Sequence, residues 1–257
     1  MSGGVLPTLE ILPDSESLAR AAALRVVRFA QEALAERGRF TLALAGGSTP
    51  RHVYARLARD ELASQIDWTR AHLFWGDERC VPPDHPESNY RMARETLLDH
   101  VPLSPGNIHR IHGEDNPTEA AHAYAQELES IFGGDARKGG RPPIGFDLVL
   151  LGMGDDGHTA SLFPRLDAVK EERRWVTAEY VEAAGMWRVT LTPVFINAAR
   201  SVMFMVSGKE KSARVKEVLE GPWRPVELPA QAIRPASGQL IWMLDQAAAS
   251  LSDRAVD

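Results

Sequence analysis

A histidine that closely follows two aspartates is the group in this sequence best suited to proton-transfer chemistry. The residues are Asp155, Asp156 and His158, in a glycine-rich turn within the segment FDLVLLGMGDDGHTASLFP. An imidazole gains and loses a proton near neutral pH, so a histidine beside a carboxylate can serve as a general base or acid. A single histidine is more commonly satisfied by local hydrogen bonds at the start of a helix. From these residues alone, both interpretations of His158 stay open.

The residues before this turn predict a strand that is buried on both faces. Residues 146–151 form a continuous apolar run, which is typical of a strand inside a parallel sheet. A turn after such a strand lies at the carboxyl edge of the sheet, where ligands of open α/β folds bind. We therefore expect the chemistry of this protein at that edge.

Three further polar turns follow predicted strands. They are GGSTP at 46–50, GDER at 76–79 and SGKEK at 207–211, after predicted strands at 40–45, 71–75 and 201–206. In a doubly wound sheet the carboxyl ends of the parallel strands share one edge. We therefore expect all four turns to meet around one pocket.

The first of these turns could bind an anion. Gly46 and Gly47 would let the backbone approach a ligand, and the following helix would present free N–H groups and the positive end of its dipole. The alternative is a tight turn in which Ser48 or Thr49 only caps the helix. The sequence leaves both roles open. It excludes a P-loop, because the lysine and the glycine spacing of that motif are absent.

The spacing Gly152-x-Gly154-x-x-Gly157 formally matches a dinucleotide-binding fingerprint. We reject that interpretation, because Asp155 and Asp156 would place negative charge where a pyrophosphate would lie. The match also stands in the middle of the chain, whereas the fingerprint belongs to a first βα unit. The sequence therefore predicts no nicotinamide or flavin cofactor.

The turn GDER offers further candidates for substrate binding. Asp77 and Glu78 could bind the substrate, or they could form a solvated turn with Arg79 as their ion partner. Cys80 comes next, and a thiol beside an arginine can be reactive. Since no base partner for the thiol is evident, we take Cys80 to be incidental.

Several basic residues in the second half of the chain lie near strand ends and could hold a phosphate, although exposed lysines and arginines are common on any surface. They are Arg188, Lys209, Lys211 and Arg234. His109 and His112 have a spacing that could bind a metal ion. The sequence has no HExxH motif and no cysteine partner for these histidines, so we expect no metal site.

The composition narrows the function classes. The chain has 257 residues, a net charge of −6 and one cysteine. The acidic charge argues against nucleic acid or an anionic membrane as a partner, although a local basic cluster could still bind a small anion. No secretory signal or membrane-spanning run is evident. We expect a cytoplasmic protein, and the sequence is compatible with a monomer without deciding the oligomeric state.

The order of predicted elements favours an α/β fold, because helical and strand-like segments alternate. Besides the strands above, the pattern predicts helices at 15–37, 50–57, 88–100, 117–132 and 209–219 and strands at 188–192 and 239–244. The segment 133–145, rich in glycine, arginine and proline, is the clearest candidate for a flexible loop. We expect residues 1–257 to form a single domain.

With these motifs in view, the sequence resembles the 6-phosphogluconolactonases, a subfamily of the glucosamine/galactosamine-6-phosphate isomerase superfamily. The likeness lies in four blocks that follow the order of the family, at 42–58, 74–98, 146–164 and 187–221. The resemblance implies a Rossmann-like, doubly wound α/β fold. It also implies hydrolysis of 6-phospho-D-glucono-1,5-lactone to 6-phosphogluconate in the oxidative pentose phosphate pathway, without a metal or organic cofactor.

The resemblance also assigns roles by position. His158 matches the general base of the family, with Asp156 as the carboxylate of its DGH turn, and Arg79 is the candidate to stabilise developing negative charge. Positions that bind phosphate in the superfamily match the turn 46–49, Arg188 and the spacing Gly208-x-x-Lys211. Whether Lys209 or Lys211 makes the contact stays open.

Two alternative functions differ from lactone hydrolysis in testable ways. Glucosamine-6-phosphate deaminases resemble this chain at the DGH turn but carry an acidic residue just before the following proline. In this chain Phe163 stands there, ahead of Pro164. A non-catalytic sugar-phosphate sensor would have lost His158 or gained a DNA-binding module, and neither is evident. We therefore favour an enzyme that hydrolyses a sugar-phosphate lactone.

Overall fold

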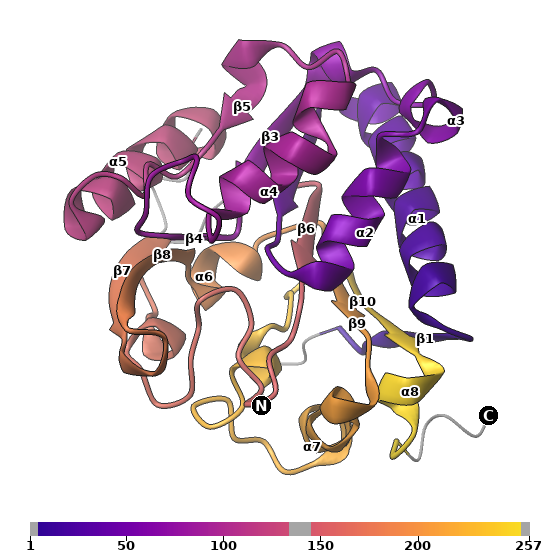
Figure 1. Cartoon of the computed structure of the whole chain (residues 1–257). Helices are drawn as coiled ribbons and strands as arrows, with labels where there is room; N and C mark the ends of the chain where they lie inside the picture. Colours follow the sequence, from indigo (N-terminus) through magenta and orange to yellow (C-terminus); the bar gives the residue numbers. More distant parts are fainter. Residues whose placement is uncertain (1–4, 134–144, 253–257) are drawn as a thin grey trace.

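A seven-stranded parallel sheet forms the centre of the computed structural model, which describes residues 5–133 and 145–252. Its strand order is β1-β10-β9-β6-β2-β3-β5, and every pairing described in it is parallel. The strands are β1 (Thr8–Leu12), β2 (Phe40–Leu44), β3 (Ala71–Trp75), β5 (Ile108–His109), β6 (Leu148–Leu151), β9 (Ser201–Val206) and β10 (Gln239–Asp245). This sheet, flanked by helices, confirms the predicted α/β class (Figure 1).

The strand order places a topological switch point between β2 and β6. From β2 the chain moves outward to β3 and β5, then returns to β6 on the other side of β2 and continues to β9 and β10. Connections that leave adjacent strands in opposite directions open a crevice at the carboxyl edge of the sheet. The predicted polar turns follow β2, β3, β6 and β9, which are neighbours at this crevice.

Helices cover both faces of the sheet. They are α1 (Ser15–Arg37), α2 (Ser48–Leu57), α3 (Asp60–Ala63), α4 (Asn89–Thr96), α5 (Pro117–Phe132), α6 (Pro193–Ile196), α7 (Ser212–Glu220) and α8 (Gln246–Ala249). In Figure 1, α1 and α2 lie to the right of the sheet and α5 lies to the left. Short 3₁₀ turns occupy Trp68–Arg70, Leu98–His100, Pro105–Asn107, Ala168–Lys170, Glu182–Ala184, Lys209–Lys211 and Pro229–Ala232.

The longest helix, α1, shows how local sequence sets the element boundaries. The side chain of Asp14 accepts a hydrogen bond from the backbone N–H of Ser17 and caps the first turn. Gly38 ends the helix with φ of 73°, a left-handed conformation that glycine adopts without steric cost. The predicted helix at 15–37 is therefore confirmed at both ends.

A second, antiparallel sheet was not predicted. It consists of β4 (Asp77–Arg79), β8 (Met186–Leu191) and β7 (Val176–Val181), in the order β4-β8-β7. The segment 76–79 is therefore not a simple turn: Gly76 leads the chain from β3 of the large sheet directly into β4 of the small one. The N–H of Gly76 donates to Leu44 (2.9 Å) and its carbonyl accepts from Leu191 (2.8 Å), so this residue joins the two sheets.

Other differences from the sequence prediction are small. The predicted strand at 188–192 begins at Met186 and belongs to the small sheet. The predicted helix at 88–100 is α4 followed by a 3₁₀ turn, and the one at 209–219 begins with a 3₁₀ turn before α7. The strands β1, β5 and β7 were missed, because short or partly exposed strands carry little apolar signal. Most of the predicted loop at 133–145 lies outside the described residues.

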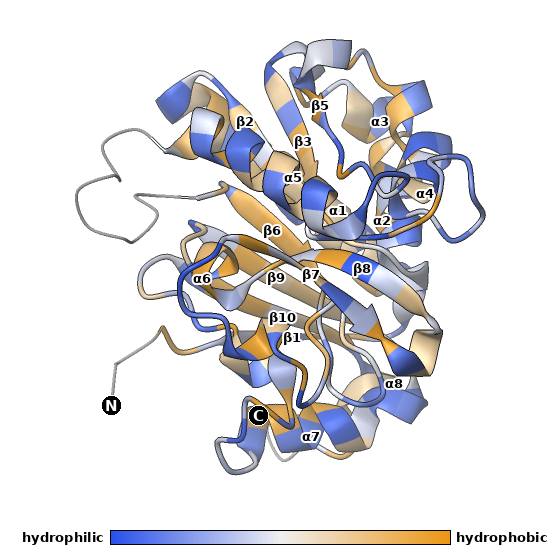
Figure 2. Cartoon of the chain, turned by 90° about the vertical axis from the view of Figure 1, so that its left-hand side faces the viewer, coloured by the Kyte–Doolittle hydropathy of each residue, from blue (hydrophilic) through white to orange (hydrophobic). Residues whose placement is uncertain are grey.

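The core lies between the large sheet and the elements that flank it. Strands β6 and β9 are buried along their whole length, as their apolar sequences predict, and they are coloured as hydrophobic in Figure 2. Trp68, Trp75 and Trp242 are the largest fully buried side chains. None of the helices in the described residues has the length and apolar character that crossing a membrane requires.

Candidate active site

One pocket of about 350 Å³ opens at the carboxyl edge of the large sheet. Its lining includes residues from all four turns that follow β2, β3, β6 and β9, together with Asn89 and Arg188. The expectation that these turns meet around one pocket is therefore confirmed. The physical cause is the strand order, which places the four strands side by side with their carboxyl ends at one edge.

His158 lines this pocket and forms a hydrogen-bonded pair with Asp156, which does not line it. The Oδ1 atom of Asp156 lies 2.6 Å from Nδ1 of His158 and also accepts the backbone N–H of His158 (2.9 Å). An ionised carboxylate can only accept hydrogen bonds, so Nδ1 of the imidazole carries the hydrogen and Nε2 is left as the basic nitrogen. Partial burial acts to raise the pKa of Asp156, but its hydrogen bonds with His158 outweigh this and hold the pKa below its usual value. The pair is therefore poised for proton transfer through Nε2.

The glycines of this turn make room for the imidazole. A Cβ atom on Gly154 would overlap the His158 ring, and the N–H of Gly154 donates to the carbonyl of His158 (2.9 Å). Gly157 has φ of 86°, which favours glycine over other residues. The spacing that formally matched a dinucleotide fingerprint is thus explained by the shape of the histidine turn.

Phe163 packs against the face of His158. The two ring centroids are 4.3 Å apart and the ring planes differ by 24°. The guanidinium of Arg188 lies 6.0 Å from the centroid of the same phenyl ring. The position at which a deaminase would carry an acidic side chain therefore holds an apolar ring against the imidazole.

Two arginines come together beside the histidine pair. Arg79 and Arg188 are direct partners in the antiparallel register of β4 and β8, and both line the pocket. The Nε atom of each is buried and has no hydrogen-bond partner within the described part of the chain. Burial, and then the charge of Arg79, lower the pKa of Arg188 below the usual arginine value. Two partly buried cations, each with a buried Nε–H that lacks a partner, form a site that an anionic ligand would complete.

The turn after β2 has the geometry of an anion-binding site. Helix α2 begins at Ser48, and its N-cap is Gly47, with φ of 101° and no side chain to cap the helix. Ser48 and Thr49 therefore do not act as N-caps. A Cβ atom on Gly46 would overlap the side-chain amide of Asn89, so only glycine fits there. Residues 46–50 line the pocket, which places the start of α2 beside the two arginines.

The two carboxylates of the GDER segment have different roles. Asp77 is buried, lines the pocket and accepts a hydrogen bond from Ser161 Oγ (2.6 Å). Glu78 is also buried, but it does not line the pocket. Its oxygens accept from the backbone N–H groups of Arg79, Asn89 and Tyr90 and from Ser88 Oγ. Burial raises the pKa of Glu78 despite these donors. Glu78 therefore holds the start of α4 in place, and a substrate contact by this residue stays a prediction.

The two candidate lysines, Lys209 and Lys211, differ in their position relative to the pocket. Lys211 lines the pocket, whereas Lys209 is exposed and does not. The ammonium of Lys211 forms an ion pair with Asp155. The structure thus brings Lys211 to the pocket and leaves Lys209 outside, which favours Lys211 of the two lysines between which the sequence left the phosphate contact open. Asp155 faces a lysine and does not contact the histidine pair that the sequence placed beside it.

Asn89 and Glu210 are among the pocket residues that the sequence analysis did not single out. Asn89 is 2% exposed, and its amide donates to the backbone carbonyl of Asp77 (2.9 Å). Glu210 lines the pocket at the turn after β9. A polar residue at the start of the predicted helix 88–100 was the only local sign of Asn89, whereas Glu210 belongs to the turn 207–211 that the sequence placed at the expected pocket.

The remaining candidates lie outside the pocket. Burial, and then the charge of Glu78, raise the pKa of the Cys80 thiol to about 11, which agrees with an incidental cysteine. His109 contacts Glu127 (2.7 Å), whereas His112 lies near Asp115. Among the described residues, no group of three or more potential ligands is arranged to hold a metal ion. The guanidinium of Arg234 stacks on the ring of Trp223 at 3.7 Å.

Comparisons with known proteins agree with this fold. A family model described as "Glucosamine-6-phosphate isomerases/6-phosphogluconolactonase" matches residues 13–242. A 6-phosphogluconolactonase of Nostoc sp. is 41% identical over 242 residues, which cover 94% of this chain and 96% of the relative. The solved 6-phosphogluconolactonase of Trypanosoma brucei superposes with a TM-score of 0.84 at 32% identity, covering 96% and 99% of the two chains. A monomeric glucosamine-6-phosphate deaminase, 21% identical with a TM-score of 0.79 over 95% and 99% of the two chains, shares the fold.

Proposed function

The chain belongs to the glucosamine-6-phosphate isomerase/6-phosphogluconolactonase family, and from this premise we propose that it hydrolyses 6-phospho-D-glucono-1,5-lactone to 6-phospho-D-gluconate. This reaction belongs to the oxidative pentose phosphate pathway. The observation that carries the proposal is that His158, hydrogen-bonded to Asp156, lines one pocket with Arg79 and Arg188. The acidic net charge of the chain gives no reason to propose nucleic acid as a partner, and we propose the cytoplasm as the compartment.

In the proposed mechanism His158 activates a water molecule. Nε2 of the imidazole removes a proton from the water molecule while the oxygen of that water attacks the carbonyl carbon of the lactone. Asp156 holds the ring in the tautomer that leaves Nε2 basic and stabilises the positive charge that the ring gains. The C–O bond to the ring oxygen then breaks, and that oxygen takes the proton from His158. The product carboxylic acid then ionises, and the enzyme returns to its starting state.

Arg79 is the group we assign to the carbonyl oxygen. That oxygen gains negative charge during the attack, so a fixed cation stabilises the transition state more than the ground state. Arg79 lines the same pocket as His158, and its Nε has no partner in the described residues. Because a lactone is already electrophilic, the proposed chemistry needs no metal, organic cofactor or covalent nucleophile. A burst of covalent acyl-enzyme would contradict direct attack by water.

The phosphate of the substrate provides binding energy away from the reacting carbonyl. We assign it to the start of α2, Arg188 and Lys211, because these groups line the same pocket and supply N–H donors and positive charge. Fixing the remote phosphate orients the lactone ring relative to His158. We further propose that residues 1–257 act as one domain, since one continuous core links both sheets.

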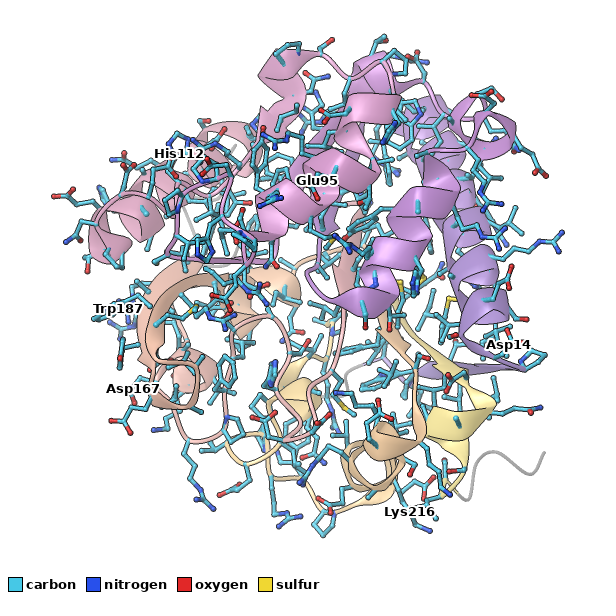
Figure 3. All side chains as sticks on the ribbon, in the orientation of Figure 1. Asp14, Glu95, His112, Asp167, Trp187 and Lys216 are labelled. Atoms are coloured by element: carbon cyan, nitrogen blue, oxygen red, sulfur yellow. The ribbon has the colours of Figure 1, made fainter. Side chains whose placement is uncertain are left out.

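The test is hydrolysis of freshly prepared 6-phosphogluconolactone, measured against its spontaneous hydrolysis. We expect rapid turnover by the wild type and a loss of about 10²–10⁴-fold in His158→Ala, which is the usual contribution of a general base. His112→Ala is the matched control, since His112 also lies near an aspartate but is exposed, at the upper left of Figure 3, and does not line the pocket. A wild type that does not exceed the spontaneous rate would disprove the proposed function, and glucosamine 6-phosphate would then be tested.

A further inference from the structure

Lys211 differs from the two arginines of the pocket, because it already forms an ion pair with a carboxylate of the protein. Its ammonium pairs with Asp155, and the side chains are 21% and 72% exposed. Within the described residues, no ion pair joins Arg79 or Arg188 to a carboxylate. Lys211 is thus the pocket cation whose charge is balanced before any ligand arrives.

The ion pair connects two loops that build the pocket. Asp155 belongs to the turn after β6, and Lys211 to the 3₁₀ turn between β9 and α7. A second contact reinforces the connection, since Nε of Arg214 donates to the backbone carbonyl of Asp155 (3.0 Å). Asp155 itself does not line the pocket, and its side chain is largely exposed to solvent.

We propose that Asp155 is an internal competitor for the substrate phosphate at Lys211, which lowers the affinity of the site for phosphate and speeds release of the product. This inference rests on the proposed function for the identity of the ligand. A phosphate monoester carries up to two negative charges at neutral pH, so it can displace a single carboxylate from the ammonium. When the product leaves, Asp155 forms the ion pair with Lys211 again. This ion pair offsets part of the free energy that is lost when the phosphate separates from the lysine.

The exposure of Asp155 limits the size of the effect. Ion pairs exposed to solvent are weak, and replacing this one should change phosphate affinity by about two- to fivefold. An effect of this size would adjust the affinity without abolishing it. The site would still bind the substrate, and the product would be released quickly.

The first experiment measures binding of inorganic phosphate to the full chain by calorimetry at low ionic strength. We expect Asp155→Asn to lower the dissociation constant by about two- to fivefold relative to wild type. Two variants control for the general loss of a negative charge. Glu217→Gln removes a carboxylate that pairs with Arg214 next to Asp155, and Asp167→Asn removes one on the far left of Figure 3. Both controls should bind phosphate as the wild type does.

A double-mutant cycle identifies Lys211 as the group through which Asp155 acts. The increase in phosphate affinity caused by Asp155→Asn should disappear in the Lys211→Gln background, because Asp155 then has no ammonium group with which to pair. An unchanged dissociation constant in Asp155→Asn, an equal gain in Glu217→Gln, persistence of the gain without Lys211, or no phosphate binding by the folded wild type would each overturn the proposal.

Kinetics separate this inference from the proposed function. If wild type hydrolyses the lactone, Asp155→Asn should lower KM and kcat together, because tighter phosphate binding slows product release. If wild type fails to hydrolyse the lactone but phosphate affinity depends on Asp155 and Lys211 as described, the proposed function fails and the inference about the ion pair stands.

Discussion

Arg79 and Arg188 lie opposite each other in the register of β4 and β8, and each has a buried Nε atom without a hydrogen-bond partner in the described residues. Two like charges held side by side destabilise each other unless an anion lies between or near them. Such a pair is therefore a strong sign of an anionic ligand. In the proposed reaction the two arginines divide the negative charge of the substrate, with the carbonyl oxygen at Arg79 and the phosphate at Arg188.

This division predicts different kinetic effects for the two arginines. Arg79→Ala should lower kcat by about 100-fold with a smaller change in KM, as when a donor to a developing oxyanion is removed. Arg188→Ala should mainly raise KM. Steady-state kinetics of both variants test this, with Arg28→Ala, an exposed arginine on α1, as the control. A pure rise in KM in Arg79→Ala would make Arg79 a phosphate ligand.

The stacking of Phe163 on His158 predicts a role for the phenyl ring in positioning the base. Aromatic contacts of this kind contribute about 0.5–1.5 kcal/mol, so Phe163→Leu should lower kcat by about three- to tenfold. Phe163→Tyr keeps the ring and should retain most of the activity. Equal rates in both variants would show that the stacking does not position the imidazole.

A histidine pair outside the pocket predicts how stability depends on pH. Nδ1 of His72 lies 3.1 Å from Nε2 of His109. Burial, and then the charges of His109 and Arg39, lower the pKa of His72 below 6.5. The folded protein therefore binds fewer protons there than the unfolded chain, so this contribution to stability is present above pH 6.5 and is lost as the pH falls below it.

Urea unfolding at about pH 7.5 and pH 5.5 tests this sign. Wild type should lose more free energy of unfolding between the two pH values than His72→Asn, which lacks the titrating group. His112→Asn, a change of an exposed histidine, should behave as wild type. A larger pH-dependent loss in His72→Asn than in wild type would reverse the assignment.

The raised pKa of Cys80 predicts an unreactive thiol. With a pKa of about 11, little thiolate is present at pH 8, so alkylation should be on the order of 100-fold slower than in the unfolded chain. Cys80→Ser should keep kcat within about twofold of wild type, because the proposed reaction does not use the thiol. Rapid labelling accompanied by loss of turnover would assign Cys80 to the site.

Local sequence was sufficient for the five longest helices, for the strands β2, β3, β6, β9 and β10 of the large sheet, and for the centre of the chemistry. The apolar run before Gly152 specified a buried strand, and the glycines after it specified the turn that carries Asp156 and His158. Both signals act within a few residues: a strand buried on both faces needs apolar side chains throughout, and a turn needs glycine where the backbone is left-handed. The resemblance of the four motifs to a known family supplied the reaction and its substrate.

The tertiary structure decided which charged groups reach the pocket. Arg188 lies beside Arg79 only because β8 pairs with β4 in a small sheet that the alternation of elements did not reveal. The 3₁₀ turn places Lys211 in the pocket and leaves Lys209 outside, while Glu78 points to the start of α4 and Asp155 reaches Lys211. These outcomes depend on how segments far apart in the chain pair as strands and on the directions in which their side chains point. Residue type and spacing identify candidate groups, whereas contacts between distant segments determine which of them act together.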